Sequence, residues 1–408
     1  MRALTLILLI CFSTLTPGQN VTVKSLQAYG GNDPLSIPLV ISSKELNQNL
    51  TIEFDIAAQA EPNLVIEFKF CDLNWQPYNN AFLYNQGRNT SQTLWFDNIK
   101  IPGSGANFHY KGSFPSFDVT FPFPGKWAFY IRDSIYRDKV YAVGYFYVVQ
   151  NPLPFKGHIN KEVLEGEIST PVELNRVYSI GADIVLPDSL APANLMGIEI
   201  VENRKMFSPY QAGKNNSGFS VYSTDGGHRF NFTARNVRPG NGYRHLDLRD
   251  KAKYNFPETN AQFDGIEYST FYNRRQQDLA GGELIENFRY EYAQYLKVKF
   301  RFRPPENTYK KVFLTGSFTN WAVLPQNELK NDNGLYTLDV ELKRGEYDYQ
   351  YVLADLIDGQ VTNIDWYTLE GNFWETDNDY HIFLYYFTPE YGGYNKIIGY
   401  KKLRSGGL

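Results

Sequence analysis

Cysteine is scarce in this chain, with two cysteines among 408 residues. Cys11 lies in an apolar stretch near the start of the sequence, and Cys71 ends a segment in which apolar and polar residues alternate. If that first stretch is removed, Cys71 has no partner and no intramolecular disulfide can form. Because inert buried cysteines are common, we expect Cys71 to be a structural residue. Stability must then come from packing.

Sequence motifs of enzymes are also missing. The chain has no G-x-S-x-G nucleophile turn, no G-x-x-x-x-G-K-[ST] phosphate loop and no H-E-x-x-H zinc motif. The histidines stand singly in separate segments, which leaves a zinc site few ligands: His109, His158, His228, His245 and His381. We therefore expect a protein that is not an enzyme and that has no cofactor or metal.

Basic clusters and long apolar runs are absent as well. The formal net charge is -4, and no stripe of Lys and Arg occurs, so a nucleic-acid partner is not expected. The first residues have the form of a secretion signal, with a basic Arg2, an apolar run over 3–15 and small residues up to Gly18. Cleavage is expected after Gly18. No other run approaches the roughly 20 apolar residues of a membrane span, so an exported protein without a transmembrane helix is predicted.

Aromatic residues are abundant, at 16% of the chain, with 31 Tyr and 29 Phe. Such residues favour β-strands over helices. In the segment 64–71 (LVIEFKFC), Ile66, Phe68 and Phe70 fall on one face, with Glu67 and Lys69 on the other. Similar segments recur along the whole chain, separated by turns. The fold class is expected to be all-β, with two to three immunoglobulin-like (E-set-type) sandwich domains and few or no helices.

The predicted domain boundaries follow the turn signals. Residues 1–18 are expected to be a signal peptide and residues 19–150 an N-terminal β-sandwich, which ends at Asn151-Pro152-Leu153-Pro154 because proline interrupts a strand ladder. Residues 151–290 are expected to form a middle β domain, and residues 291–408 a C-terminal immunoglobulin-like sandwich.

Aromatic residues beside polar turns are the candidate contact residues for a partner protein or a sugar. Flat indole faces near turns can stack on sugar rings or anchor a partner. The alternative is that these side chains close the ends of the sandwich cores. The candidates are Trp75, Phe318, Trp321, Trp366 and Trp374.

Several blocks of the sequence resemble the plug proteins of the type IX secretion systems of Bacteroidota. The resemblance extends over nearly the whole chain after the signal. Its blocks occur in the family's order at 70–77 (FCDLNWQP), 238–248 (RPGNGYRHLDL), 345–352 (GEYDYQYV), 369–380 (LEGNFWETDNDY) and 392–400 (GGYNKIIGY). It implies a non-catalytic periplasmic protein that binds the outer-membrane translocon barrel and occludes its periplasmic opening.

The last domain also resembles glycogen-binding modules through residues 311–321 (KVFLTGSFTNW). Trp321 matches the first sugar-stacking tryptophan of those modules and Trp366 only approximately the second, while Gln350 replaces a lysine. A carbohydrate-binding protein of the periplasm or cell surface is therefore the alternative function, although a shared fold is the safer inference. A hydrolase, which needs a pair of converging carboxylates, and a structural surface protein are weaker hypotheses.

Overall fold

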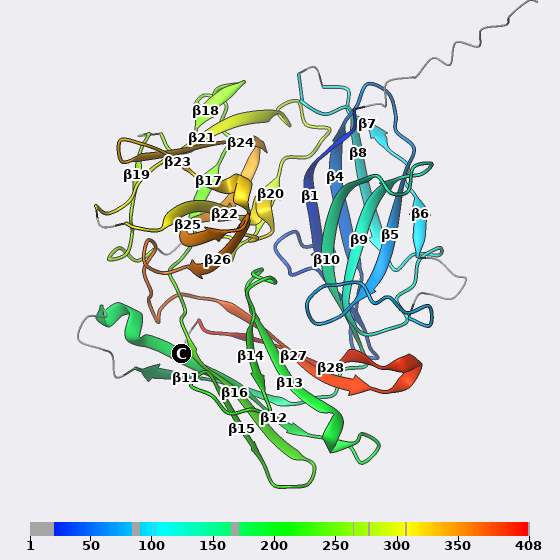
Figure 1. Cartoon of the computed structure of the whole chain (residues 1–408). Helices are drawn as coiled ribbons and strands as arrows, with labels where there is room; N and C mark the ends of the chain where they lie inside the picture. Colours follow the sequence, from blue (N-terminus) through cyan, green and yellow to red (C-terminus); the bar gives the residue numbers. More distant parts are fainter. Residues whose placement is uncertain are drawn as a thin grey trace, which may run out of the picture.

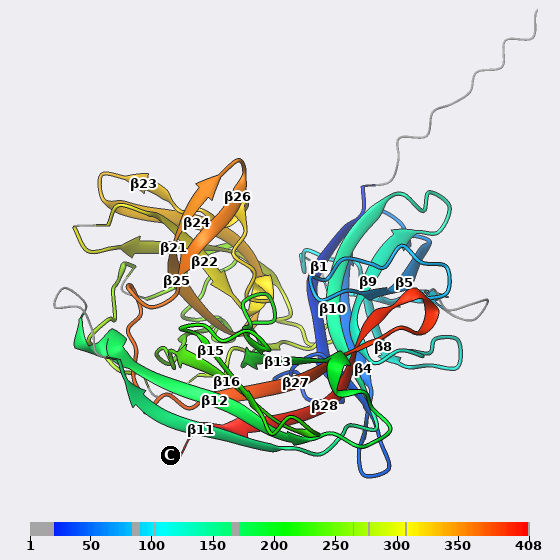
Figure 2. The same ribbon diagram turned by 60° about the horizontal axis from the view of Figure 1, so that its bottom comes forward.

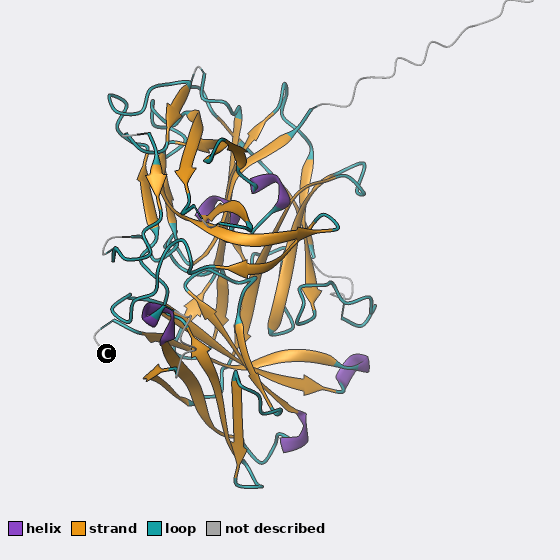
Figure 3. Ribbon diagram, turned by 60° about the vertical axis from the view of Figure 1, so that its left-hand side comes forward, coloured by secondary structure: helices purple, strands orange, loops and turns teal. Residues whose placement is uncertain are grey.

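The computed structural model describes residues 20–406, except for 84–89, 102, 165–170, 264, 276–277 and 307. The predicted signal peptide, including Cys11, lies outside the described residues. The described chain consists of β-strands in six sheets joined by turns, which confirms the all-β fold class. Its helices are single 3-10 turns: η1 (Val172–Asn175), η2 (Pro192–Asn194), η3 (Ser317–Thr319), η4 (Pro325–Asn327) and η5 (Glu390–Gly392) (Figure 3). Among the described residues, no helix is long and apolar enough to cross a membrane.

The N-terminal unit is a sandwich of two sheets. Sheet A has the strand order β1 (Thr22–Gly30), β4 (Leu50–Ala57), β8 (Phe108–Phe114), β7 (Asp97–Asn98). Sheet B has the order β3 (Asn47–Gln48), β2 (Leu39–Ser42), β10 (Val140–Gln150), β9 (Gly125–Asp133), β5 (Leu64–Cys71), β6 (Ser91–Thr93). The inward side chains of both sheets form an aromatic core in which Phe68 contacts Phe114 and Phe146. Burial raises the pKa of the Cys71 thiol to about 12, so it stays protonated.

The middle unit is closed by the end of the chain. Sheet C has the order β11 (Lys156–Val163), β12 (Arg176–Val185), β16 (Arg229–Val237), β15 (Ser220–Thr224). Sheet D has the order β14 (Tyr210–Gly213), β13 (Leu195–Glu202), β27 (Asp379–Thr388), β28 (Tyr394–Arg404). Ile382 and Leu384 of β27 lie in one buried cluster with Ile180 and Ile200. The last two strands therefore belong to the middle unit.

The third unit is inserted into the middle one. Sheet E contains β17 (Arg244–Asp247), β20 (Glu283–Ile285), β22 (Lys311–Gly316), β25 (Gly345–Ile357) and β26 (Gln360–Asp365). Sheet F contains β18 (Glu258–Asn260), β19 (Glu267–Tyr268), β21 (Tyr295–Arg303), β23 (Lys330–Asp332) and β24 (Leu335–Lys343). We call these two sheets the inserted unit.

The domain boundaries predicted at residues 290 and 291 therefore differ from the sheet pairing. Strands β17 to β20, which precede residue 290, pair with β25 and β21 of the inserted unit. Conversely, β27 pairs with β13 across a long sequence separation. The physical reason is that strand pairing is not confined to neighbours in sequence, so turn spacing could not reveal which sheet a strand joins.

The three units pack against one another. Figure 1 shows the inserted unit and the N-terminal unit side by side above the middle unit. In Figure 2 the red strands β27 and β28 run from beneath the inserted unit to the N-terminal unit. One apolar cluster crosses this boundary, because Tyr147 of β10 stacks on Phe383 of β27 with ring centroids 4.1 Å apart.

Candidate functional site

The candidate tryptophan Trp321 lies inside the molecule. It follows η3 of the inserted unit, where Asn320 and Trp321 both have positive φ angles and so end the 3-10 turn in a left-handed conformation. Its indole is 2% exposed and packs on Tyr243, with ring centroids 4.3 Å apart. The indole Nε1 donates a hydrogen bond of 2.7 Å to the Gly281 carbonyl. This face is therefore not open for stacking on a sugar, and the core-closing interpretation fits Trp321.

The other candidate aromatic residues of the C-terminal half are also packed against neighbouring segments. Trp366 is partly buried against a small cluster of the inserted unit, and the Lys205 ammonium lies 4.8 Å from its ring centroid. Trp374 packs on the core of the middle unit and donates to the Val177 carbonyl at 3.1 Å. Phe318 packs on the core of the inserted unit. The structure does not bring these residues together on one exposed surface.

Trp75 lies at the boundary between the N-terminal and middle units. Its ring contacts Tyr147 and lies 4.5 Å from the Lys126 ammonium. That ammonium reaches the carboxylate of Glu199 on β13 at 2.8 Å, and both side chains are buried. Tyr147 donates a second hydrogen bond to Glu199 at 3.0 Å, and Tyr385 donates a third at 3.3 Å. A buried carboxylate with this many partners joins the two units in one defined arrangement.

A second buried ion pair joins the N-terminal unit to the inserted unit. Asp55 of β4 accepts a hydrogen bond of 2.7 Å from Lys343 of β24 and one of 2.9 Å from the Tyr295 hydroxyl. His109 contacts the other oxygen of Asp55 at 2.7 Å and stacks on Phe288. Although burial raises the pKa of Asp55, the contacts with His109 and Lys343 lower it overall. The carboxylate therefore stays charged where the units meet.

All three units meet around Arg204, which follows β13. The Arg204 guanidinium donates to main-chain carbonyls of the N-terminal unit, among them Ala28 at 2.9 Å and Pro34 at 2.9 Å. Glu283 of the inserted unit is 6% exposed, and one of its carboxyl oxygens has no hydrogen-bond partner among the described residues. Burial raises the pKa of Glu283 to about 7, although the positive charge of Arg204 lowers it in part.

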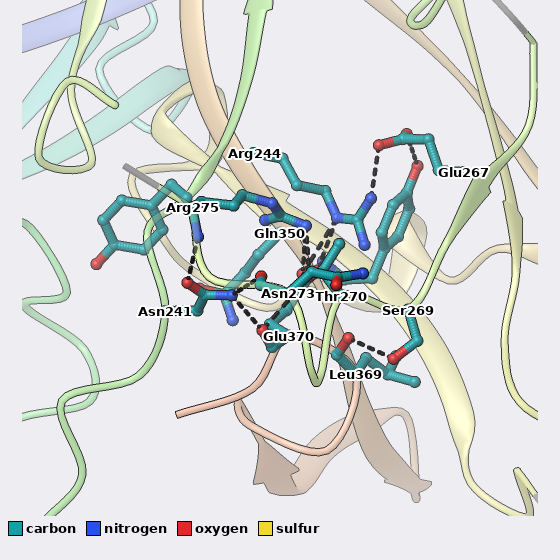
Figure 4. A network of polar contacts seen from close by, with 12 residues as sticks. Asn241, Arg244, Glu267, Ser269, Thr270, Asn273, Arg275, Gln350, Leu369 and Glu370 are labelled. Atoms are coloured by element: carbon teal, nitrogen blue, oxygen red, sulfur yellow. Dashed lines mark hydrogen bonds and ion pairs between the residues drawn. The ribbon is translucent and has the colours of Figure 1, made fainter. Parts of the chain in front are cut away.

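A network centred on Glu370 holds the loops of the inserted unit together (Figure 4). Its carboxylate accepts hydrogen bonds from Arg244 at 2.9 Å and from Arg275 at 3.1 Å, as well as one from the Tyr351 backbone N–H at 2.8 Å. Arg244 also reaches Glu267 at 2.8 Å. Although burial raises the pKa of Glu370, the two guanidinium groups lower it to about 2.

Sequence reasoning did not single out these buried charged residues. Two of them lie within blocks that carried the family resemblance, because Arg244 belongs to 238–248 and Glu370 to 369–380. The same two blocks meet again where Asn372 accepts a hydrogen bond from the Gly240 N–H at 2.8 Å and Asn378 donates one to the Pro239 carbonyl at 2.7 Å. The blocks thus share a structural role at the boundary between the inserted and middle units.

We call the contacts around Glu199, Asp55 and Arg204 the three-unit junction. The carboxylates of Glu199 and Asp55 are paired with lysines, whereas one carboxyl oxygen of Glu283 near Arg204 has no hydrogen-bond partner among the described residues. The junction also borders a cavity of about 760 Å³ that is lined by both apolar and charged residues. Burial lowers the pKa of His381 in its wall to about 3, which keeps that imidazole neutral at pH 7. No group of three His, Cys, Asp or Glu side chains suited to a metal ion occurs among the described residues. The arrangement is suited to holding three sandwiches in one body.

The raised pKa of Glu283 predicts a pH-dependent contribution to stability. The folded carboxyl has a pKa of about 7 against 4.5 for an ordinary glutamate, so folding increasingly opposes its ionisation as the pH rises from 4.5 to 7. The shifted pKa therefore lowers the free energy of unfolding by about 3 kcal/mol above pH 7 and has no effect well below pH 4.5. Glu283→Gln stays neutral, so the variant is expected to gain stability over the wild type on going from pH 5 to pH 8.

The measurement is urea unfolding of both proteins at the two pH values. Glu341→Gln is the matched control, because Glu341 is exposed and pairs with Lys24 at the surface. That control is expected to change stability by less than about 1 kcal/mol at either pH. An equal loss of stability in the wild type and in Glu283→Gln between pH 5 and pH 8 would contradict the assignment.

Comparison with known proteins identifies the fold but no family. No family model matches the chain, and no curated protein matches it. A crystal structure of a hypothetical protein from Parabacteroides merdae ATCC 43184 is similar, with a TM-score of 0.73 and 19% sequence identity, covering 95% of this chain and 98% of that one. A biofilm-associated protein, BSP domain, has a TM-score of only 0.15. At this identity the likeness to the Parabacteroides protein shows that the two chains share the same all-β, multidomain architecture.

Proposed function

We propose that this protein is a non-catalytic periplasmic plug that binds the outer-membrane translocon barrel of a type IX secretion system and occludes its periplasmic opening. The observation that carries the proposal is the three-unit junction, where buried ion pairs such as Lys126–Glu199 and Asp55–Lys343 fix the sandwiches to one another. The sequence blocks shared with the plug family support the choice of partner.

Rigidity matters because of the size of the opening. The largest outer-membrane barrels have about 36 strands and enclose a wide lumen. Three sandwiches on flexible linkers would move independently and leave gaps, since interfaces between domains are usually small and polar. Removing one partner of a buried ion pair costs about 3–5 kcal/mol, so units joined by several such pairs resist separation. One broad stopper is therefore suited to this task.

Three exposed apolar side chains at one end of sheet B form the proposed contact surface. Trp95 follows β6, and Ile135 and Tyr136 lie in the turn between β9 and β10, with exposed fractions of 78%, 74% and 71%. Both segments flank the start of β5, because Leu94 and Ser134 donate backbone hydrogen bonds to Leu64 and Asn63. Trp95 therefore lies on one side of the start of β5, and Ile135 and Tyr136 lie on the other, all at one end of sheet B. We call these three residues the end patch. Exposed aromatic residues of this kind often anchor a protein partner.

The test is affinity purification of the tagged translocon from cell envelopes under gentle extraction. The protein is expected to be recovered with the translocon, and its absence would overturn the proposal. The double variant Trp95→Ser with Tyr136→Ser is expected to reduce recovery about tenfold or more, because truncated aromatic anchors commonly cost 2 kcal/mol or more.

The matched control places the same change on the inserted unit. Phe263→Ser with Tyr309→Ser removes two aromatic side chains with exposed fractions of 76% and 93%. Recovery of this variant is expected to equal that of the wild type. If the two double variants are recovered equally, the end patch is not the contact surface. The plug function is tested separately, by whether the wild-type protein is recovered with the translocon.

Carbohydrate binding remains the second hypothesis from the sequence, and the structure offers it little support. A sugar site of the glycogen-binding type would need the Trp321 face, which packs on Tyr243. Any glycan site would therefore have to use other residues of the surface.

A further inference from the structure

Strand β10 has an open edge beside a groove. One edge pairs with β9 along residues Val140 to Val148. The other edge pairs with β2 only from Tyr147 to Gln150. In the described part of the chain, no strand pairs with residues 141–145 on that second edge. Residues 142–145 of this central strand thus pair with another strand on one side only, while Tyr141 lies at an irregularity in the pairing with β9.

The pairing of β10 with β2 shows which residues of β10 direct their main-chain N–H and C=O groups to the open edge. The Tyr147 N–H donates to the Pro38 carbonyl on the β2 side at 3.0 Å. Because successive residues of a strand direct their main-chain groups to opposite edges, Val143 and Tyr145 direct theirs to the same side as Tyr147. An unpaired edge of this kind is a template for another strand.

A cavity of about 280 Å³ runs along this edge. Val143, Gly144 and Tyr145 of β10 line it together with Leu26 and Ala28 of β1. The opposite wall comes from the inserted unit, including Phe318, Ala322 and Leu324, and one end comes from Met206 and Phe207 of the middle unit. The groove is therefore complete only when all three units are packed together.

The side chains that line the groove determine which kind of ligand it can bind. No lining residue carries a charge, so an ion or a strongly charged molecule would lose its hydration without compensation. Apolar walls favour apolar side chains, while the edge offers a row of main-chain donors and acceptors. An extended peptide with small apolar residues at alternate positions satisfies both requirements.

We propose that the open edge of β10 over residues 141–145 binds an extended apolar segment of another polypeptide as an added β-strand. The segment lies in the groove between β10 and the η3 turn, and continues the line of β2 along β10. Its main chain pairs with Val143 and Tyr145, and alternate side chains enter the cavity. This site is distinct from the end patch and does not depend on the plug function.

The experiment measures binding of a fluorescent, end-blocked peptide of alternating Thr and Val to the full protein by fluorescence anisotropy. Val143→Pro removes a main-chain donor on the open edge but keeps the ladder with β9, as proline is tolerated on the free side of an edge. We expect binding at least tenfold weaker. Ala322→Phe, which narrows the groove from the inserted unit, is expected to weaken binding similarly without altering β10.

The matched control is in the peptide, where N-methylation of alternate residues removes donors but keeps the apolar side chains. Loss of binding with this peptide and with both variants supports strand addition. Equal binding of both peptides, or no effect of either variant in a protein that unfolds at the wild-type temperature, overturns the proposal. Occupation of the groove by a second copy of the chain, detected as a dimer that Ala322→Phe dissociates, would also overturn it.

Discussion

Glu370→Ala is expected to lower the free energy of unfolding by about 3–5 kcal/mol, because it leaves the buried Arg244 and the partly buried Arg275 without their shared counter-charge. Glu370 is 3% exposed, and it accepts hydrogen bonds from both Arg244 and Arg275. The Tyr351 N–H would lose its partner as well. Urea unfolding followed by tryptophan fluorescence measures the change.

The control for this prediction is a carboxylate–arginine ion pair at the surface. Asp377 pairs with Arg404, and the two side chains are 42% and 69% exposed. Asp377→Ala is expected to cost at most about 1 kcal/mol, since solvent screens exposed charges. If Glu370→Ala cost no more than Asp377→Ala, the network in Figure 4 would not stabilise the inserted unit as described.

Trp321→Ala is expected to destabilise the protein by a comparable amount, about 3–5 kcal/mol, because it leaves a large cavity between units. The Gly281 carbonyl would also lose the indole N–H, and Tyr243 its ring contact. Thermal unfolding of the variant should show a lower midpoint. Loss of glycan binding in this variant would therefore not identify a sugar contact, because the surrounding fold is weakened.

Trp95→Ala is the matched control for Trp321→Ala. It removes the same side chain from a position that is 78% exposed, and should change stability by less than about 0.5 kcal/mol. Trp321→Phe keeps most of the packing and should fall between the two. A midpoint for Trp321→Ala equal to that of Trp95→Ala would show that Trp321 is not part of the core.

Strands could be predicted from the sequence because their signal is local. The alternation in Leu64–Cys71 matches β5, and its inward residues Ile66, Phe68 and Phe70 are buried. The pairing partners could not be predicted in the same way. Strand β27 (DYHIFLYYFT) is apolar or aromatic at most positions, a pattern that does not indicate which sheet it joins, and its partner β13 lies far away in sequence.

The candidate site was harder to predict than the fold. A tryptophan beside a polar turn has the same sequence context whether its indole points outward or, as in Trp321, into the molecule. The buried charged residues gave no signal, since an isolated Asp55 or Lys343 resembles any surface charge until the fold brings the two together. The family resemblance did include the sequence blocks that contain Arg244 and Glu370, although it did not indicate that these two residues pair.

The placement of β27 and β28 has a consequence for how the protein is made. These are the last described strands to leave the ribosome, yet Phe383 and Ile397 pack in the cluster that joins the middle unit to the N-terminal one. Neither unit can bury all its apolar surface until synthesis has passed residue 404. Premature termination before Asp379 should therefore expose hydrophobic surface on two units at once and mark the product for degradation.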